Sequence, residues 1–233
     1  MFFDPLYLIL VAPAMLLAAW ASWKVHSSFQ WASQLAPASG ISGEEAAAVI
    51  VKHSGLNGVA IEPTEGFLGD HYDPTKKVLR LSPQVMNGRS LAALGVAAHE
   101  AGHALQDAEG YPLLRLRNGL VPLASTGGTL SMILLMAGFF LQSFEFVIAG
   151  IVFFSFTVLF QLINLPVEFD ASRRAKKLLV DIGMVRPDEA PAVSKVLSAA
   201  AMTYVAATLM GVMQLLYFLI QAGLFGGRSN DDA

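Results

Sequence analysis

Four long apolar stretches constrain the fold of this 233-residue chain more than any other feature. Each is poor in charge and about long enough to cross a bilayer core of roughly 30 Å; they are residues 6–23, 120–140, 146–165 and 205–225. An average soluble domain has about 25% charged residues, whereas this chain has 14% charged and 55% hydrophobic residues. The sequence therefore predicts a mainly α-helical membrane protein with about four transmembrane helices.

The first apolar stretch has two interpretations. Small residues around Trp20 loosely fit a signal-peptidase site, so the stretch could be a cleaved signal peptide. No Lys or Arg precedes it, however, and the positive region that begins a signal peptide is missing. We therefore expect residues 1–23 to form an uncleaved membrane anchor.

The basic residues indicate a topology. All but one of the 15 Lys and Arg residues lie in segments 24–117 and 173–195, which four crossings place on the same side of the membrane. The positive-inside rule makes that side the cytoplasm, so we expect a multi-pass protein of the cell (inner) membrane. The basic run at 173–177 is explained by attraction to anionic lipid headgroups, without any nucleic-acid role.

Short helices and strands are expected after the first span. Ser42 and Glu45 have the spacing of a capping box, which predicts a helix. Apolar residues at 58–62 and 77–82, with turn signals between them, predict a small antiparallel pair of strands. A turn that ends in an N-cap at Ser90, followed by good helix formers at 91–109, predicts a further helix. The chain then divides into five segments. They are an N-terminal anchor (1–23), an α+β segment (24–119), two transmembrane helices (120–165), a cytoplasmic helical segment (166–204), and a C-terminal transmembrane helix with a polar tail (205–233).

The helix at 91–109 carries a motif typical of zinc peptidases. His99 and His103 are four residues apart, which places them on one face of a helix, and Glu100 lies beside them. In this H-E-x-x-H arrangement zinc lowers the pKa of a bound water to about 7, and the glutamate accepts the water's proton. The motif indicates a zinc hydrolase, and the alternative is a chance match in a protein without metal.

A third ligand is needed, because a catalytic zinc usually has three protein ligands and one open position. The chain has no cysteine, and its other histidines, His26, His53 and His71, all precede the motif. A carboxylate is therefore favoured. The best candidate segment is 165–178, because two spans separate it from the motif and return it to the same side of the membrane.

Longer strings of residues resemble a known family. The strings are GDHYDP at 69–74, VLRLSP at 78–83, NGRSLAALGVAAHEAGHALQ at 87–106 and PVEFDASRRA at 166–175. Together they resemble the YugP-type neutral zinc metallopeptidases of bacterial membranes, over nearly the whole chain from the first span onward. The layout is similar to that of gluzincin membrane proteases. This resemblance implies a membrane endopeptidase with one Zn²⁺ per chain.

The resemblance also implies residue roles. His99 and His103 match the two histidine ligands of the family. Glu168 matches the third ligand, and Glu100 matches the base. Ser172 departs from the pattern, because many gluzincins have an acidic residue there that orients a ligand histidine. Asp170 is the nearest carboxylate, so it is either a supporting residue or a competitor of Glu168 for the metal.

Gluzincins bind the substrate backbone on a strand above the metal, and the resemblance assigns this role to the strand expected at 77–82. Its central residues are Val78, Leu79, Arg80 and Leu81. In the preceding loop, His71 and Tyr72 are candidate donors to the developing oxyanion. The alternative is that they belong to a turn stabilised by Asp73 and Pro74.

The expected partners are a peptide or membrane-protein substrate and the lipid bilayer; oligomer or adaptor partners stay open. One rival is an intramembrane protease, but the short helix is followed by Gln106, Asp107 and Glu109, which favours a water-facing site. Another rival is a non-enzymatic, zinc-stabilised scaffold or adaptor, which would hold its metal in a closed site with four ligands.

Overall fold

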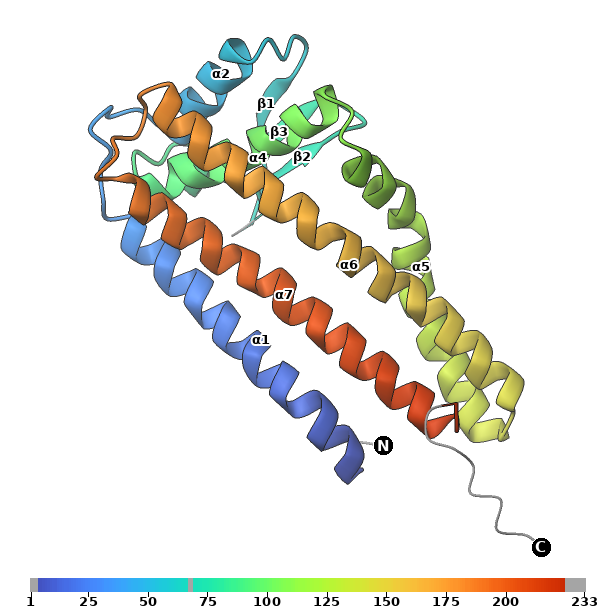
Figure 1. The fold of residues 1–233 in the computed structure, drawn as a ribbon. Coiled ribbons are helices and arrows are strands. Elements are labelled where there is room, and N and C mark those ends of the chain that lie inside the picture. Colours follow the sequence, from blue (N-terminus) through green and yellow to red (C-terminus); the bar gives the residue numbers. More distant parts are fainter. Residues whose placement is uncertain (1–3, 67–68, 225–233) are drawn as a thin grey trace, which may run out of the picture. The chain divides into compact units, whose positions relative to one another are not determined.

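The computed structural model describes residues 4–66 and 69–224. Its helices and strands, labelled in Figure 1, are α1 (Pro5–Ala32), α2 (Gly43–His53), β1 (Ala60–Pro63), β2 (His71–Asp73), β3 (Val78–Leu81), α3 (Pro83–Met86), α4 (Leu91–Ala108), α5 (Pro112–Leu141), α6 (Phe144–Asp181) and α7 (Ala190–Gln221). The polar tail expected at the C-terminus lies outside the described residues.

Four helices, α1, α5, α6 and α7, are long and apolar enough to cross a membrane. Together with the small three-stranded sheet, they confirm the expected fold class of a mainly α-helical membrane protein with a small α+β part. Each helix begins before its apolar stretch, and α1, α5 and α6 also end after it, whereas α7 ends at Gln221, inside the stretch 205–225. The clearest case is α6, whose 38 residues continue through Pro166 into a charged segment.

The chain forms two compact units. The helical unit comprises Met1–Trp20, Leu116–Leu165 and Tyr204–Ala233. The mixed unit, which contains the sheet, comprises Ala21–Arg115 and Pro166–Thr203. Because α1, α6 and α7 each contribute to both units, residues far apart in the sequence meet in each of them.

In the helical unit, segments of α1, α7, α6 and α5 lie side by side (Figure 1). An apolar cluster of Leu135, Ile151, Tyr217 and Phe218 is buried there. The Tyr217 hydroxyl donates to the Asp4 carboxylate over 3.0 Å, and the same carboxylate accepts the Leu6 N–H over 2.9 Å. The first helix is thus packed into the unit by both polar and apolar contacts.

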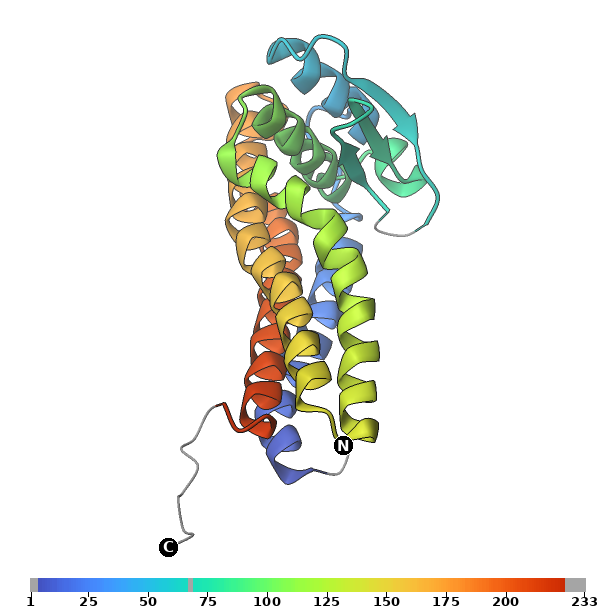
Figure 2. The same ribbon diagram turned by 90° about the vertical axis from the view of Figure 1, so that its right-hand side faces the viewer.

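The sheet of the mixed unit has the strand order β1-β3-β2 (Figure 2). β1 pairs with β3 in parallel, and β2 pairs with β3 antiparallel. The expected antiparallel pairing of segments 58–62 and 77–82 is therefore wrong. The segment between them contains β2, which runs opposite to both, so that β3 follows the same direction as β1.

The two expected helices of this unit begin at the predicted caps. The Ser42 hydroxyl accepts the Glu45 N–H over 3.2 Å, and the Glu45 carboxylate accepts the Ser42 N–H over 2.6 Å, which confirms the capping box. The Ser90 hydroxyl caps α4 by accepting the Ala93 N–H. α2 packs against α4, and α4 also contacts β2 and β3, so that sheet and helix share one buried core.

Small residues let α4 approach its neighbours closely. A Cβ atom at Gly102 would lie 2.8 Å from the backbone oxygen of Ala171 on α6. A Cβ atom at Gly95 would lie 3.1 Å from the Val193 side chain on α7. The glycines thus allow the helix that carries the two histidines to lie directly against the charged end of α6.

Candidate metal centre

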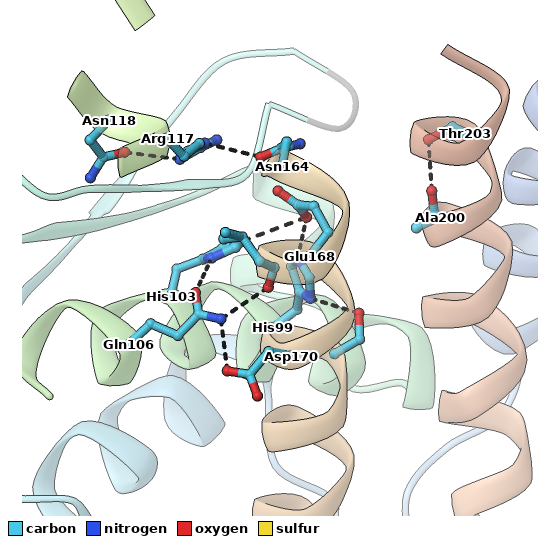
Figure 3. A network of polar contacts seen from close by, with 12 residues as sticks. His99, His103, Gln106, Arg117, Asn118, Asn164, Glu168, Asp170, Ala200 and Thr203 are labelled. Atoms are coloured by element: carbon cyan, nitrogen blue, oxygen red, sulfur yellow. Dashed lines mark hydrogen bonds and ion pairs between the residues drawn. The ribbon is translucent and has the colours of Figure 1, made fainter. Parts of the chain in front are cut away.

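Three potential metal ligands converge in the mixed unit (Figure 3). His99 and His103 lie on α4 and Glu168 lies on α6, with one donor atom from each residue within 4.8 Å of the others. Glu168 Oε2 is 3.2 Å from His99 Nε2 and 3.7 Å from His103 Nε2. Glu168 and His103 are buried and His99 is half-buried. The structure therefore brings together the ligand set expected from the sequence.

The residues fit a zinc ion in chemistry, and the two distances from Glu168 to the histidines fit it in spacing. Two imidazole nitrogens and one carboxylate oxygen form the ligand set of several catalytic zinc sites. In a tetrahedral site with zinc bonds of about 2.0–2.2 Å, neighbouring ligand atoms are about 3.3–3.5 Å apart. The two nitrogen–oxygen distances lie on either side of that range. Three protein ligands also leave the fourth position open, as catalysis requires.

The other nitrogen of each imidazole faces a neutral side chain. His99 Nδ1 is 3.2 Å from the Ser172 hydroxyl, and His103 Nδ1 is 3.0 Å from the Gln106 amide oxygen. Metal-bound histidines usually donate this second N–H to a nearby acceptor, which orients the ring. Ser172, expected from the sequence only as a departure from the family pattern, thus contacts His99. From the sequence, Gln106 was expected only as one of the polar residues that favour a water-facing site, whereas in the structure it is completely buried.

Asp170 points to other partners. Its carboxylate accepts the Gln106 amide N–H over 2.9 Å and the Arg174 Nε–H over 2.6 Å, and it forms an ion pair with Arg173. It is not part of the group of donors near Glu168. Of the two roles expected for Asp170, the geometry favours support of the site over competition for the metal.

Negative charge surrounds the position where a metal would bind. Burial alone would lower the pKa of His103, but the hydrogen bond to Glu168 and the charges of Glu100 and Glu168 outweigh it and raise that pKa. The site therefore stabilises positive charge. Glu100 is itself buried, and no hydrogen bond or ion pair ties its carboxylate to another described residue.

His71 and Tyr72 lie on β2, in a segment expected from the sequence to be a loop. The Tyr72 hydroxyl donates to Asp107 of α4 over 2.7 Å. Burial and this hydrogen bond raise the pKa of Tyr72 above its usual range. His71 is exposed, and its Nδ1 is 2.8 Å from the backbone oxygen of Gly69. The Tyr72 hydroxyl thus joins β2 to α4 in this structure.

The strand expected to bind substrate is already paired on both sides. Each β3 residue has a register partner in β1, and three of the four also have one in β2. The expectation that Val78, Leu79, Arg80 and Leu81 pair with a substrate backbone is therefore wrong, because a central strand has no free edge for a further strand. Within the described part of the chain, the outer edges of β1 and β2 have no partner strand.

Comparisons with known proteins add three findings. The sequence model of a family described as "Putative neutral zinc metallopeptidase" matches residues 7–223. A protein of Bacillus subtilis (strain 168), "Putative membrane protease YugP", is 46% identical over 215 residues, which cover 92% of this chain and 96% of that protein. No solved structure matches the chain.

Proposed function

The chain belongs to the neutral zinc metallopeptidase family, and from this premise we propose that it is a membrane-embedded zinc endopeptidase with a cytoplasm-facing active site. One observation carries the proposal: His99, His103 and Glu168 offer three converging donors, and the buried carboxylate of Glu100 directly follows the first of them. A buried carboxyl group that no described residue hydrogen-bonds is costly, so its presence beside three potential ligands favours a catalytic role.

The roles of the residues follow from their positions. His99, His103 and Glu168 would hold the zinc ion, which when bound polarises the scissile carbonyl and acidifies a water. Glu100 accepts a proton from the attacking water and then delivers it to the amine nitrogen of the leaving group. Burial of Glu100 limits competing hydration of its carboxylate during this transfer.

A non-enzymatic, zinc-stabilised scaffold is the main alternative. A structural zinc site is almost always closed by four protein ligands, most often including cysteines. This chain has no cysteine, and the described residues offer three donors at the site. An incomplete ligand set is what an enzyme needs, because the remaining position must accept water or substrate.

A water-facing site is favoured over an intramembrane one. α4 is not among the four helices that are apolar enough to cross a membrane. All Lys and Arg residues except Arg117 and Arg228 belong to the mixed unit, and a concentration of positive charge is typical of cytoplasmic segments. Both observations support a catalytic part that meets substrates at the cytoplasmic side.

The substrate backbone is proposed to bind along β2 in place of β3. β2 is an edge strand, and it contacts α4, the helix that carries both histidines. β1 is also an edge strand, but it contacts α2. An extended peptide could therefore add to the outer edge of β2 by backbone hydrogen bonds and lie near the motif helix.

Replacement Glu100→Gln tests the proposal. The purified protein in detergent is incubated with fluorescently labelled casein and with a peptide mixture, and cleavage is followed by fluorescence and mass spectrometry. We expect turnover to fall by at least about 10²-fold, because the amide cannot accept the proton. Zinc should stay near one per chain by elemental analysis, because the ligands are unchanged.

The matched control is Glu44→Gln, the same chemical change at an exposed position of α2, which should leave both cleavage and zinc unchanged. Cleavage retained in Glu100→Gln would refute the mechanism. Full cellular function in that variant, with zinc bound, would favour the scaffold.

A further inference from the structure

The ring of His103 contacts the side-chain amide of Gln106, whose oxygen and nitrogen are both within hydrogen-bond distance of partners. Gln106 is completely buried. Its oxygen lies 3.0 Å from His103 Nδ1, and its nitrogen donates over 2.9 Å both to the backbone oxygen of Val167 and to the carboxylate of Asp170 (Figure 3). The amide therefore links α4 to α6 beside the candidate metal position.

This set of partners fixes which way the amide points. An amide nitrogen has two hydrogens and accepts nothing, whereas its oxygen only accepts. If the amide were turned over, its oxygen would face two acceptors, the Val167 carbonyl and the Asp170 carboxylate, with no hydrogen between them. The nitrogen must therefore face α6, which leaves the oxygen of Gln106 to accept a hydrogen from His103.

The protonation of the imidazole follows from the orientation of the amide. A neutral histidine carries one ring hydrogen, on either Nδ1 or Nε2. The Gln106 oxygen stabilises the form with the hydrogen on Nδ1. In that form the free electron pair is on Nε2, the nitrogen that faces Glu168 and that a metal would use.

We propose that Gln106 is a positioning residue for His103, which it holds in the ring orientation and tautomer needed to bind zinc. The inference rests on the proposed function only in taking His103 as a ligand. Where many metal sites place a carboxylate directly against the ligand histidine, this chain places a neutral amide there and a carboxylate behind it.

Asp170 completes the arrangement. It is buried, and its charge is balanced by Arg173 and by Arg174, which also pairs with Glu109 over 2.7 Å. Because Asp170 is compensated in this way, it can remain ionised and hold the Gln106 nitrogen. Asp170 thus acts on His103 indirectly, by holding the amide of Gln106. The bond to the Val167 carbonyl, next to Glu168 in the chain, ties the same amide to the third ligand's helix.

The test is the zinc affinity of Gln106→Leu, measured in the purified full-length protein by competition with a chromogenic chelator. Leucine has a similar volume and no acceptor. Loss of a supporting residue of this kind typically weakens metal binding about 10–100-fold, and we expect a loss in that range. Substitution with Co²⁺ gives a second readout, because a freed ring should change the visible absorption of the bound ion. The matched control is Gln161→Leu in the helical unit, which should leave both unchanged.

A conservative variant separates positioning from general support of the fold. Gln106→Glu keeps an oxygen to accept from His103 but has no N–H group for Val167. It is combined with Asp170→Asn, so that the second carboxylate oxygen does not face the Asp170 carboxylate and the net charge of the site is unchanged. If Gln106 acts on the ligand, this variant should bind zinc more tightly than Gln106→Leu. If Gln106 only joins the helices through its N–H groups, the two variants should bind equally weakly, and that result would overturn the inference.

Two further outcomes separate this inference from the proposed function. Wild-type affinity in Gln106→Leu would overturn this inference and leave the proposed function standing, whereas absence of zinc from the wild-type protein would overturn both. If Gln106→Leu does not fold, Gln106→Asn takes its place. Its shorter amide cannot reach His103 and Asp170 together, so the same loss is expected, and unchanged affinity would count against the inference.

Discussion

Glu168 is central to the candidate metal site, because one of its oxygens lies within 3.7 Å of a nitrogen of each histidine. In detergent-purified protein, elemental analysis should give about one zinc per chain for the wild type. His103→Ala and Glu168→Ala should each lose most of it, because two ligands hold zinc far more weakly than three. Asp170→Asn should lose less metal than Glu168→Ala, because Asp170 acts on the site only through Gln106. The control is Glu44→Gln at an exposed position of α2, which should retain the metal.

Unchanged zinc in Glu168→Ala would place the third ligand elsewhere and contradict this assignment. If zinc were lost in Asp170→Asn and retained in Glu168→Ala, Asp170 would take over the ligand role. The absence of zinc from every sample prepared without chelators would favour the metal-free alternative.

Replacement of Tyr72 by Phe tests whether the hydroxyl of this residue has a structural or a catalytic role. Tyr72→Phe removes only the hydroxyl that donates to Asp107. Loss of one such hydrogen bond typically costs about 1 kcal/mol of stability, and we expect a small decrease in the thermal midpoint with little change in turnover. An oxyanion donor would instead lose about 10²–10³-fold in kcat. A decrease of that size, with zinc retained, would show that the hydroxyl serves the reaction.

Individual site residues were predictable to different degrees. His99, Glu100 and His103 form a local pattern with a direct physical meaning on a helix. Glu168 required the resemblance to a family, because nothing in its immediate sequence distinguishes it from Asp170 as a ligand. Gln106 gave only a weak signal, its spacing of three residues from His103, because its other partners lie on α6, more than 60 positions along the chain.

At the scale of elements, the contact between α4 and α6 controls the geometry of the site. A Cβ atom added at Gly102 would meet backbone atoms of Ala171, the nearest at 2.8 Å, and backbone cannot move aside cheaply. Gly102→Ala should therefore destabilise the protein by about 1–3 kcal/mol and weaken zinc binding, because Ala171 is three residues from Glu168. Thermal unfolding in detergent and chelator competition measure the two effects.

Gly119→Ala is the matched control. A Cβ atom there meets nothing within 4 Å, so the protein should be unchanged or slightly more stable through better helix propensity. If Gly102→Ala bound zinc like the wild type and unfolded at the same temperature, the close approach of α4 and α6 would not be needed for the site.

Elements defined by local signals were predicted well, and elements defined by distant contacts were not. The caps at Ser42 and Ser90 stand at the starts of α2 and α4 as expected. β2 was missed, because a strand of three residues is too short for an alternating pattern. The pairing of β1 with β3 then came out parallel instead of antiparallel. The long helices begin before their apolar stretches, because hydropathy marks where lipid can contact a helix and not where the helix begins or ends.

For the whole molecule, the division into two units follows the distribution of charge. Among the described residues, Arg117 is the only Lys or Arg in the helical unit. Arg117 is satisfied within that unit, since its Nε–H donates to Asn164 over 3.0 Å. The other described basic residues belong to the mixed unit with the candidate metal site, so the side on which these charges lie is also the side on which the enzyme would meet its substrates.

The absence of cysteine from the chain makes that topology directly measurable. Lys177→Cys places a thiol at an exposed position in the charged part of α6, and Glu145→Cys places one at the exposed start of the same helix. The apolar stretch 146–165 lies between them, so an impermeant maleimide should reach only one of the two in intact spheroplasts. The positive-inside rule predicts labelling of Glu145→Cys from outside and of Lys177→Cys only after permeabilisation. The reverse pattern would place the zinc site outside the cell, and labelling of both from outside would mean that α6 does not cross the membrane.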